Sequence, residues 1–154
     1  MDLPKRKSPR LRGHDYSGHK SYFVTICTHK MARVFGDAAI LNEWGEIAEN
    51  ELLNIPERFH GVQIDKHVIM PNHIHAIITI GRNAERSRPF PTLSTIIGLY
   101  KSGVSKRIHD IAPDETTIWQ KSFYDRIIRD EHGYRQVWRY IDENPSNWHE
   151  DEYY

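Results

Sequence analysis

Strand-like patterns of apolar residues recur along the chain, and three of them fall between residues 21 and 80. Residues 21–28 are rich in β-branched and aromatic side chains, which pack well on a pleated surface and indicate a strand. Apolar residues at alternate positions of residues 62–70 predict a second strand, with one apolar face formed by Val62, Ile64, Val68 and Met70. The Pro-Asn pair at 71–72 favours a turn, so residues 73–80 are expected to return as a third strand in an antiparallel hairpin.

Three other segments place apolar residues at helical spacing. The first begins at Asn42, a residue suited to the N-cap position, and stops at Pro56. The second begins at Thr92 and has one apolar stripe, formed by Leu93, Ile96, Ile97, Tyr100, Val104 and Ile108. The third covers residues 131–144 and ends at Pro145, with apolar positions at Tyr134, Val137, Trp138 and Ile141.

A fourth strand is expected over residues 119–129, which gives the element order β, α, β, β, α, β, α. This order is typical of the split βαβ arrangement, a ferredoxin-like or RRM-like α+β fold. We therefore expect one antiparallel sheet with helices on one face. A length of 154 residues suits a single domain, here residues 21–145, flanked by residues 1–20 and 146–154.

Charge is balanced overall but not along the chain. Lys plus Arg and Asp plus Glu number 21 each, so net charge gives no argument for a polyanionic partner. The first 20 residues, however, carry six basic and two acidic groups, whereas residues 141–154 carry five acidic and no basic groups. A basic arm and an acidic tail suit a polyanion bound on one face, although solvated termini of no functional consequence fit the charges equally well.

Several classes of protein are excluded by simple features of the sequence. The longest apolar stretch, residues 76–80, is far shorter than the roughly 20 residues of a membrane span. The first residues lack the apolar core of a signal peptide, so a cytoplasmic protein with no membrane partner is expected. The single cysteine, Cys27, can form neither an internal disulfide nor a cysteine metal cluster, so any metal needs His, Asn, Gln or carboxylate ligands.

The first candidate site is the pair His73 and His75 in the expected third strand. Alternate residues of a strand face the same side, so both imidazoles project together and can bind one divalent ion. On its own the pair does not distinguish a metal site from structural or surface histidines, because the chain has 10 histidines.

The residues around this pair resemble a known superfamily. The run at 68–78 resembles the metal-binding core of the HUH endonucleases, in which two histidines flank a bulky hydrophobic residue, and specifically that of the single-tyrosine transposases. Residues 22–28 resemble the first strand of that family and residues 100–102 its second helix. The segments 119–129 and 140–145 resemble the end of the domain in one branch, the REP-associated tyrosine transposases (RAYTs).

The resemblance assigns roles to two residues of the last helix. The family's nucleophile is a tyrosine, with a polar metal ligand one turn later, and Tyr140 and Asn144 match these positions. Residues four apart share one helix face, so both side chains can reach the same ion and phosphate. Insertion-sequence relatives commonly carry Gln where this chain has Asn144, which keeps the amide but shortens its reach. Without the motif, Tyr140 would be read as a boundary aromatic residue that covers the core.

Two other tyrosines compete with Tyr140 for the catalytic role. Tyr134 lies on the apolar stripe and is expected in the core, whereas Tyr124 lies in a strand without a polar partner at helical spacing. Either ring can stack on bases.

The resemblance also implies a reaction and its partners. Tyr140 would attack a phosphodiester to leave a 5′-phosphotyrosine and a free 3′-hydroxyl, and a second 3′-hydroxyl could then rejoin the DNA. The implied cofactor is Mg²⁺ or Mn²⁺, although two imidazoles alone also suit zinc. The implied substrate is single-stranded DNA folded into hairpins such as REP palindromes. Many relatives are homodimers, so Tyr140 could serve its own chain or a partner.

Basic and aromatic residues are the expected DNA contacts, although surface cations are often only solubilising. The candidates for phosphates or a guide sequence are Arg6, Lys7, Arg10 and Arg12. Those for the hairpin stem are Arg82, Arg86, Arg88, Lys101 and Lys106, and those for base stacking are Trp119 and Tyr124, with Phe123 expected in the core.

Two alternatives stay open. Another metalloenzyme with a histidine pair, such as a small hydrolase or a cupin-like oxygenase, needs a further ligand, and none occurs at cupin-like spacing. A non-catalytic nucleic-acid-binding module would keep the basic surface without needing His73, His75 and Tyr140 together. A Tyr140→Phe variant separates these functions.

Overall fold

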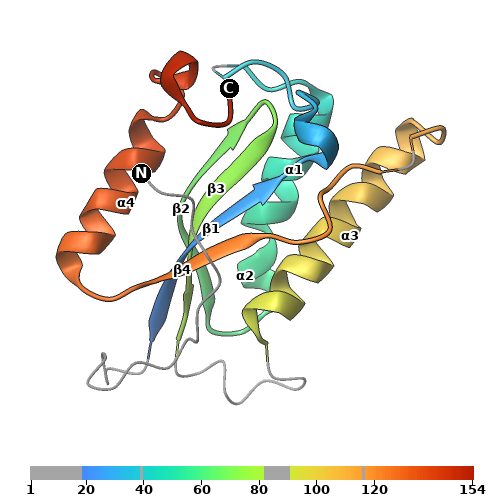
Figure 1. Cartoon of the computed structure of the whole chain (residues 1–154). Helices are drawn as coiled ribbons and strands as arrows, with labels where there is room; N and C mark the ends of the chain where they lie inside the picture. Colours follow the sequence, from blue (N-terminus) through green and yellow to red (C-terminus); the bar gives the residue numbers. More distant parts are fainter. Residues whose placement is uncertain (1–18, 39, 82–90, 116) are drawn as a thin grey trace.

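The strands of this protein form a single four-stranded sheet. A computed structural model describes residues 19–38, 40–81, 91–115 and 117–154 (Figure 1). The strands are β1 (Lys20–Cys27), β2 (Val62–Met70), β3 (His73–Ile80) and β4 (Tyr124–Ile128), in the spatial order β2-β3-β1-β4. Every neighbouring pair is antiparallel, as the sequence predicts.

The connections between strands give the split βαβ topology. Helices α1 (Glu43–Leu53) and α2 (Ile55–Arg58) connect β1 to β2, and β3 lies between these two strands. Helix α3 (Leu93–Ile111) connects β3 to β4, and β1 lies between them. The α+β class and the antiparallel sheet are therefore confirmed.

The main core lies between one face of the sheet and helices α1 and α3. Sheet residues such as Val24, Ile26 and Ile74 are fully buried there. The apolar stripe predicted for α3 faces this core along its whole length, and Tyr100 within it donates a 2.8 Å hydrogen bond to the Ala48 carbonyl. Burial of these side chains is the main source of stability of the fold.

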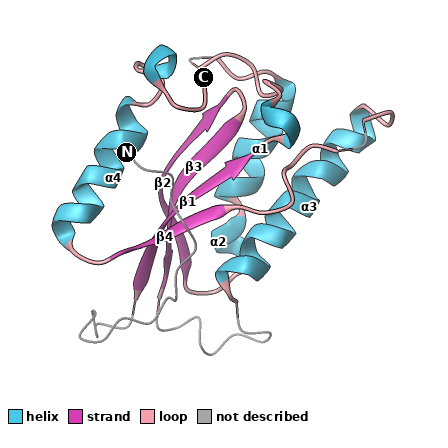
Figure 2. Cartoon of the chain, viewed as in Figure 1, coloured by secondary structure: helices cyan, strands magenta, loops and turns pink. Residues whose placement is uncertain are grey.

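The last helix does not lie with the others. Helix α4 (Glu131–Glu143) covers the opposite face, so the expectation of helices on one face only is wrong (Figures 1 and 2). Its Val137 and Ile141 pack on Phe23 of β1 and Ile77 of β3. The central strands carry apolar residues at consecutive positions, so both of their faces require cover.

A bulge in β2 changes which residues of this strand share a face. The pairing with β3 shifts register between Ile64 and Lys66, and Asp65 is the extra residue. Ile64 therefore packs with the main core, whereas Val68 packs on the α4 side. The expectation of one apolar face from Val62 to Met70 is wrong, because the bulge reverses the alternation midway.

The predicted helix starts are confirmed, whereas the stop at Pro56 and the bounds of the fourth strand differ from the prediction. Asn42 and Thr92 accept hydrogen bonds from backbone N–H groups of the first turn, as N-caps do. Pro56 lies in the first turn of α2, where a missing N–H costs little. The fourth strand is shorter than residues 119–129, because Trp119 makes only an isolated bridge with Thr28.

None of the described helices combines the length and the apolar character that a membrane crossing demands. The basic arm before residue 19 and the arginines Arg82, Arg86 and Arg88 lie outside the described residues.

Candidate functional site

His73 and His75 lie side by side on the face of β3 that α4 covers. Their side chains are 0% and 1% exposed, and their ring centroids lie 4.6 Å apart. Ile74 between them points into the main core on the other face. The prediction that both imidazoles share one face is confirmed.

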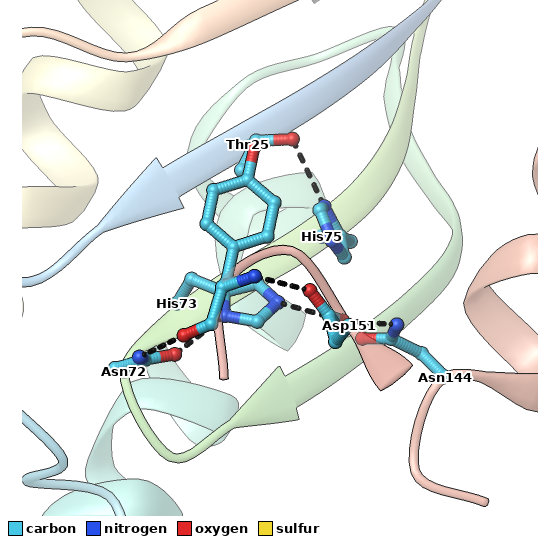
Figure 3. Close-up of polar contacts among 7 residues, drawn as sticks. Thr25, Asn72, His73, His75, Asn144 and Asp151 are labelled. Carbon is cyan, nitrogen blue, oxygen red and sulfur yellow. Dashed lines mark hydrogen bonds and ion pairs between the residues drawn. The ribbon is translucent and has the colours of Figure 1, made fainter. Parts of the chain in front are cut away.

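The position of the ring hydrogen on His73 is fixed by its neighbour. The Asn72 amide Nδ2 donates a 2.6 Å hydrogen bond to the Tyr153 carbonyl, which orients the amide and directs its Oδ1 at the His73 Nδ1, 2.7 Å away (Figure 3). Because an amide oxygen only accepts, Nδ1 of His73 carries the hydrogen. Nε2 therefore keeps a free lone pair.

His75 is held in the same way from the neighbouring strand. Its Nδ1 lies 2.9 Å from the Thr25 hydroxyl oxygen on β1 (Figure 3). In the tautomer that donates this bond, Nε2 again keeps its lone pair. The Nε2 atoms of both histidines are buried and have no hydrogen-bond partner among the described residues. Each is an unsatisfied atom of the kind that a metal ion satisfies.

Burial keeps both imidazoles neutral. Desolvation lowers the pKa of His73 to about 4, with smaller opposing effects of the Asp151 carboxylate and of Asn144. Desolvation, and then the proximity of His73, holds the pKa of His75 well below its ordinary value. At neutral pH both rings are therefore in the protonation state that binds metal.

Asn144 reaches the histidines from the C-terminal end of α4, where it is the C-cap residue. Its side chain is 3% exposed, and its Nδ2 donates a 2.6 Å hydrogen bond to Oδ2 of Asp151. Its Oδ1 is buried without a hydrogen-bond partner among the described residues. A free amide oxygen beside two free imidazole nitrogens fits the donor set that a divalent metal needs.

Asp151 is a member of the site that the sequence did not indicate. Its side chain is fully buried, with Oδ2 3.8 Å from Nε2 of His73. One ligand atom from each of His73, His75 and Asp151 lies within 4.8 Å of the other two. The sequence signal for a buried C-terminal segment is its aromatic content. Trp148 and Tyr153 of this segment are buried together with Cys27 and Met70.

Tyr140 lies next to this cluster in the same chain. Its ring centroid is 5.3 Å from that of His75 and 5.9 Å from that of Phe23. Its pKa is raised, first by burial and then by the carboxylates of Asp151 and Glu152. A cavity of about 270 Å³ opens beside it, lined by Tyr140, Glu143, Asn144, Asn147, Glu150, Asp151 and Glu152. An acidic lining disfavours a phosphate unless a cation is bound there.

The competing tyrosines lie in other surroundings. The Tyr134 hydroxyl donates a 2.8 Å hydrogen bond to Asp65 in the β2 bulge, and its ring packs at the edge of the α4 core. Tyr124 is half-buried and packs near Trp148 and Tyr153. Neither of these two tyrosines lies as close to the histidine pair as Tyr140 does.

Two of the residues expected to contact DNA, Trp119 and Lys101, make hydrogen bonds within the protein. Trp119 is 8% exposed and donates a 3.2 Å hydrogen bond to the Lys101 carbonyl, so base stacking by Trp119 is excluded in this arrangement. The Lys101 ammonium donates to the carbonyls of Gln120 and Ser122 at 2.9 and 2.8 Å. Lys106 is exposed on α3.

One family model and one known relative match most of this chain. The family model described as "Transposase IS200 like" matches residues 21–144, which include both histidines, Tyr140 and Asn144. A Haemophilus influenzae protein described only as uncharacterized is 33% identical, over 97% of this chain and 93% of its own length.

Two solved structures share the fold. One is a REP-associated tyrosine transposase bound to a REP hairpin, at TM-score 0.59 and 18% identity, covering 92% of this chain and 74% of the other. The second is a Deinococcus radiodurans protein assigned as a transposase, at TM-score 0.53 and 18% identity, covering 87% of this chain and 95% of the other. With the family model matched across the sheet, the histidine pair and α4, the chain belongs to the IS200-like transposase family.

Proposed function

We propose that this protein cleaves and rejoins single-stranded DNA next to hairpins, through a covalent bond between DNA and Tyr140. The observation that carries this proposal is the position of the Tyr140 ring, whose centroid is 5.3 Å from that of His75 and which lines a cavity of about 270 Å³. Membership of a transposase family supports the same reaction class.

The proposed reaction proceeds in two balanced steps. The Tyr140 Oη attacks phosphorus, the bond from phosphorus to the 3′-oxygen breaks, and the phenol proton passes to the leaving oxygen or to solvent. A 5′-phosphotyrosine and a 3′-hydroxyl result. In the second step another 3′-hydroxyl attacks the adduct, the phosphotyrosine bond breaks and Tyr140 regains its proton. The phosphodiester energy is conserved in the adduct, so no ATP is needed.

The residues of the site suit the divalent metal that the family implies, Mg²⁺ or Mn²⁺. His73, His75 and Asn144 would hold it through two neutral imidazole nitrogens and an amide oxygen, each buried and free of other hydrogen bonds among the described residues. When bound, the metal supplies positive charge that polarises the phosphate and favours the ionised phenol. That charge offsets the raised pKa of Tyr140.

Tyr140 is proposed to act on the site of its own chain. The tyrosine, both histidines and Asn144 come together within one chain, so a partner subunit is not needed to complete the site. On this proposal, cleavage does not require a homodimer.

The proposed substrate is a hairpin of the REP type. A solved protein of the same fold is bound to a REP hairpin, and this chain has a basic first segment and an exposed Lys106 to contact phosphates. Arg6, Lys7, Arg10, Arg12, Arg82, Arg86 and Arg88 remain proposed contacts, as does Tyr124.

A denaturing gel tests this function. Labelled hairpins from DNA flanking the gene are incubated with Mn²⁺ or Mg²⁺ and with wild type, Tyr140→Phe or the matched variant Tyr124→Phe. We expect a denaturation-resistant protein–DNA band in wild type and Tyr124→Phe, and none in Tyr140→Phe or with chelator. Cleavage that persists in Tyr140→Phe would indicate a water-activating metal hydrolase, whereas tight binding without cleavage would indicate a binding module.

A further inference from the structure

We propose that Asp151 is a direct ligand of the metal held by His73 and His75, so that the C-terminal segment completes the metal site. This inference rests on the proposed metal-dependent function and extends it to a residue outside the matched family segment, which ends at residue 144. One of the acidic residues near the end of the chain, Asp151, then has a defined role, which is to bind the metal.

The surroundings of the Asp151 carboxylate call for a cation. The side chain is fully buried, and its hydrogen bonds come from neutral groups, Nδ2 of Asn144 at 2.6 Å and the backbone N–H of Tyr153 at 2.8 Å. Within the described part of the chain, no Lys or Arg nitrogen lies within 4.0 Å of it. A buried carboxylate is costly unless it is paired with a positive charge or coordinates a metal.

Beyond these two hydrogen bonds, the carboxylate faces the ring nitrogens of the two histidines. Nε2 of His73 lies 3.8 Å from Oδ2, too far for a hydrogen bond, and a ring nitrogen of His75 completes a group whose atoms all lie within 4.8 Å of one another. Two atoms that each lie about 2.1 Å from one ion are at most about 4.2 Å apart, so binding requires a contraction of about 0.6 Å or less. Rotation of side chains is sufficient for a shift of that size.

The C-terminal segment is anchored firmly enough to position a ligand. The guanidinium of Arg33 lies 4.4 Å from the ring centroid of Tyr154 and 5.2 Å from that of Trp148. Next to them, the Tyr153 ring packs on His73 at 4.5 Å, and its carbonyl accepts the hydrogen bond from Asn72. Asp151 lies between these anchors, so its carboxylate is preorganised at the histidines.

The completed donor set is compatible with Mn²⁺, one of the two ions that the family implies. Two imidazole nitrogens combined with a carboxylate and an amide oxygen suit a divalent ion that accepts both nitrogen and oxygen, such as Mn²⁺. The alternative role for Asp151 is to occupy the position of the substrate phosphate and so block the site. The two roles predict opposite effects of its removal on metal affinity.

Calorimetric titration of the full chain with Mn²⁺, without DNA, separates them. We expect Asp151→Asn to bind Mn²⁺ at least tenfold more weakly than wild type. The control Asp114→Asn, which removes the same charge from an exposed loop away from the site, should stay within twofold. Arg33→Gln, which loosens the anchor without touching the ligands, should lower the affinity by a smaller factor. Circular dichroism in chelator establishes that each variant is folded.

Unchanged or tighter Mn²⁺ binding by folded Asp151→Asn would overturn the proposal, as would an equal loss in Asp114→Asn. Failure of the proposed function has a different signature. In that case wild type binds Mn²⁺ through Asp151 and yet forms no Tyr140-dependent adduct with hairpin DNA.

Discussion

The amide of Asn72 accepts a hydrogen bond from the adjacent His73 at 2.7 Å and thereby determines which ring nitrogen of that histidine can bind metal. We expect Asn72→Ala to weaken Mn²⁺ binding by about 10- to 100-fold, because His73 loses both its orientation and its preferred tautomer. Calorimetric titration measures the effect, with Asn50→Ala on the exposed face of α1 as the matched control. Equal affinities of the two variants would show that this hydrogen bond does not prepare the site.

The metal-free protein should lose stability as the pH falls from about 6.5 toward 4. The pKa of His73 falls from 6.5 in the unfolded chain to about 4 in the fold, and burial also holds the pKa of His75 well below its ordinary value. Between these values the unfolded chain binds more protons, so unfolding becomes easier as pH falls. Each imidazole contributes a slope that approaches about 1.4 kcal/mol per pH unit, and the contribution is constant above about pH 6.5.

Urea unfolding in chelator at several pH values checks this dependence. His73→Gln should flatten the slope, whereas His132→Gln, an exposed histidine on α4, should leave it unchanged. A slope in His73→Gln as steep as that of wild type would assign the pH dependence to other groups.

Tyr134→Phe should reduce stability without affecting the reaction. Its hydroxyl donates to Asp65, which also accepts from Thr79 at 2.7 Å, so the variant removes one hydrogen bond from the β2 bulge. The expected cost is about 1 kcal/mol in the free energy of unfolding, with adduct yield on hairpin DNA close to that of wild type. Loss of the adduct in a folded Tyr134→Phe protein would contradict the assignment of the nucleophile to Tyr140.

Asp130→Ala should destabilise α4, the helix that carries Tyr140. The Asp130 carboxylate accepts a 2.7 Å hydrogen bond from the Gly133 N–H and caps the helix. Removing such a cap costs about 1 kcal/mol, measured by denaturant unfolding against Asp114→Ala in an exposed loop. A cost equal to that of the control would mean that packing on Phe23 and Ile77, not the cap, determines the start of the helix.

The elements with clear periodicity and caps could be predicted from sequence. The third helix was expected over residues 131–144 and is observed at Glu131–Glu143, because Asp130 and Pro145 mark its ends. The shared face of His73 and His75 follows from strand geometry alone. Tyr140 and Asn144 required the family motif, because spacing on one helix says nothing about what that helix packs against.

The errors have physical causes that a linear pattern does not contain. A single extra residue, Asp65, reverses the faces of β2, and nothing in the alternation distinguishes a bulge from a polar substitution. Charge counting places Asp151 in an acidic tail and gives no sign of its burial, because that burial depends on anchors at Arg33 and Asn72 that are distant in sequence. Trp119, predicted to stack on bases, lies in the main core. Its burial also depends on packing against residues that are distant in sequence.

The central claim is that Tyr140 forms the covalent bond to DNA, and mapping that bond tests it most directly. The adduct formed by wild type with Mn²⁺ and a hairpin is digested with protease and nuclease, and the nucleotide-bearing peptide is identified by mass spectrometry. We expect the phosphate on Tyr140, whose ring lies 5.3 Å from His75. Phosphate on Tyr153, whose ring lies 4.5 Å from His73, or cleavage that leaves no modified tyrosine, would contradict the mechanism.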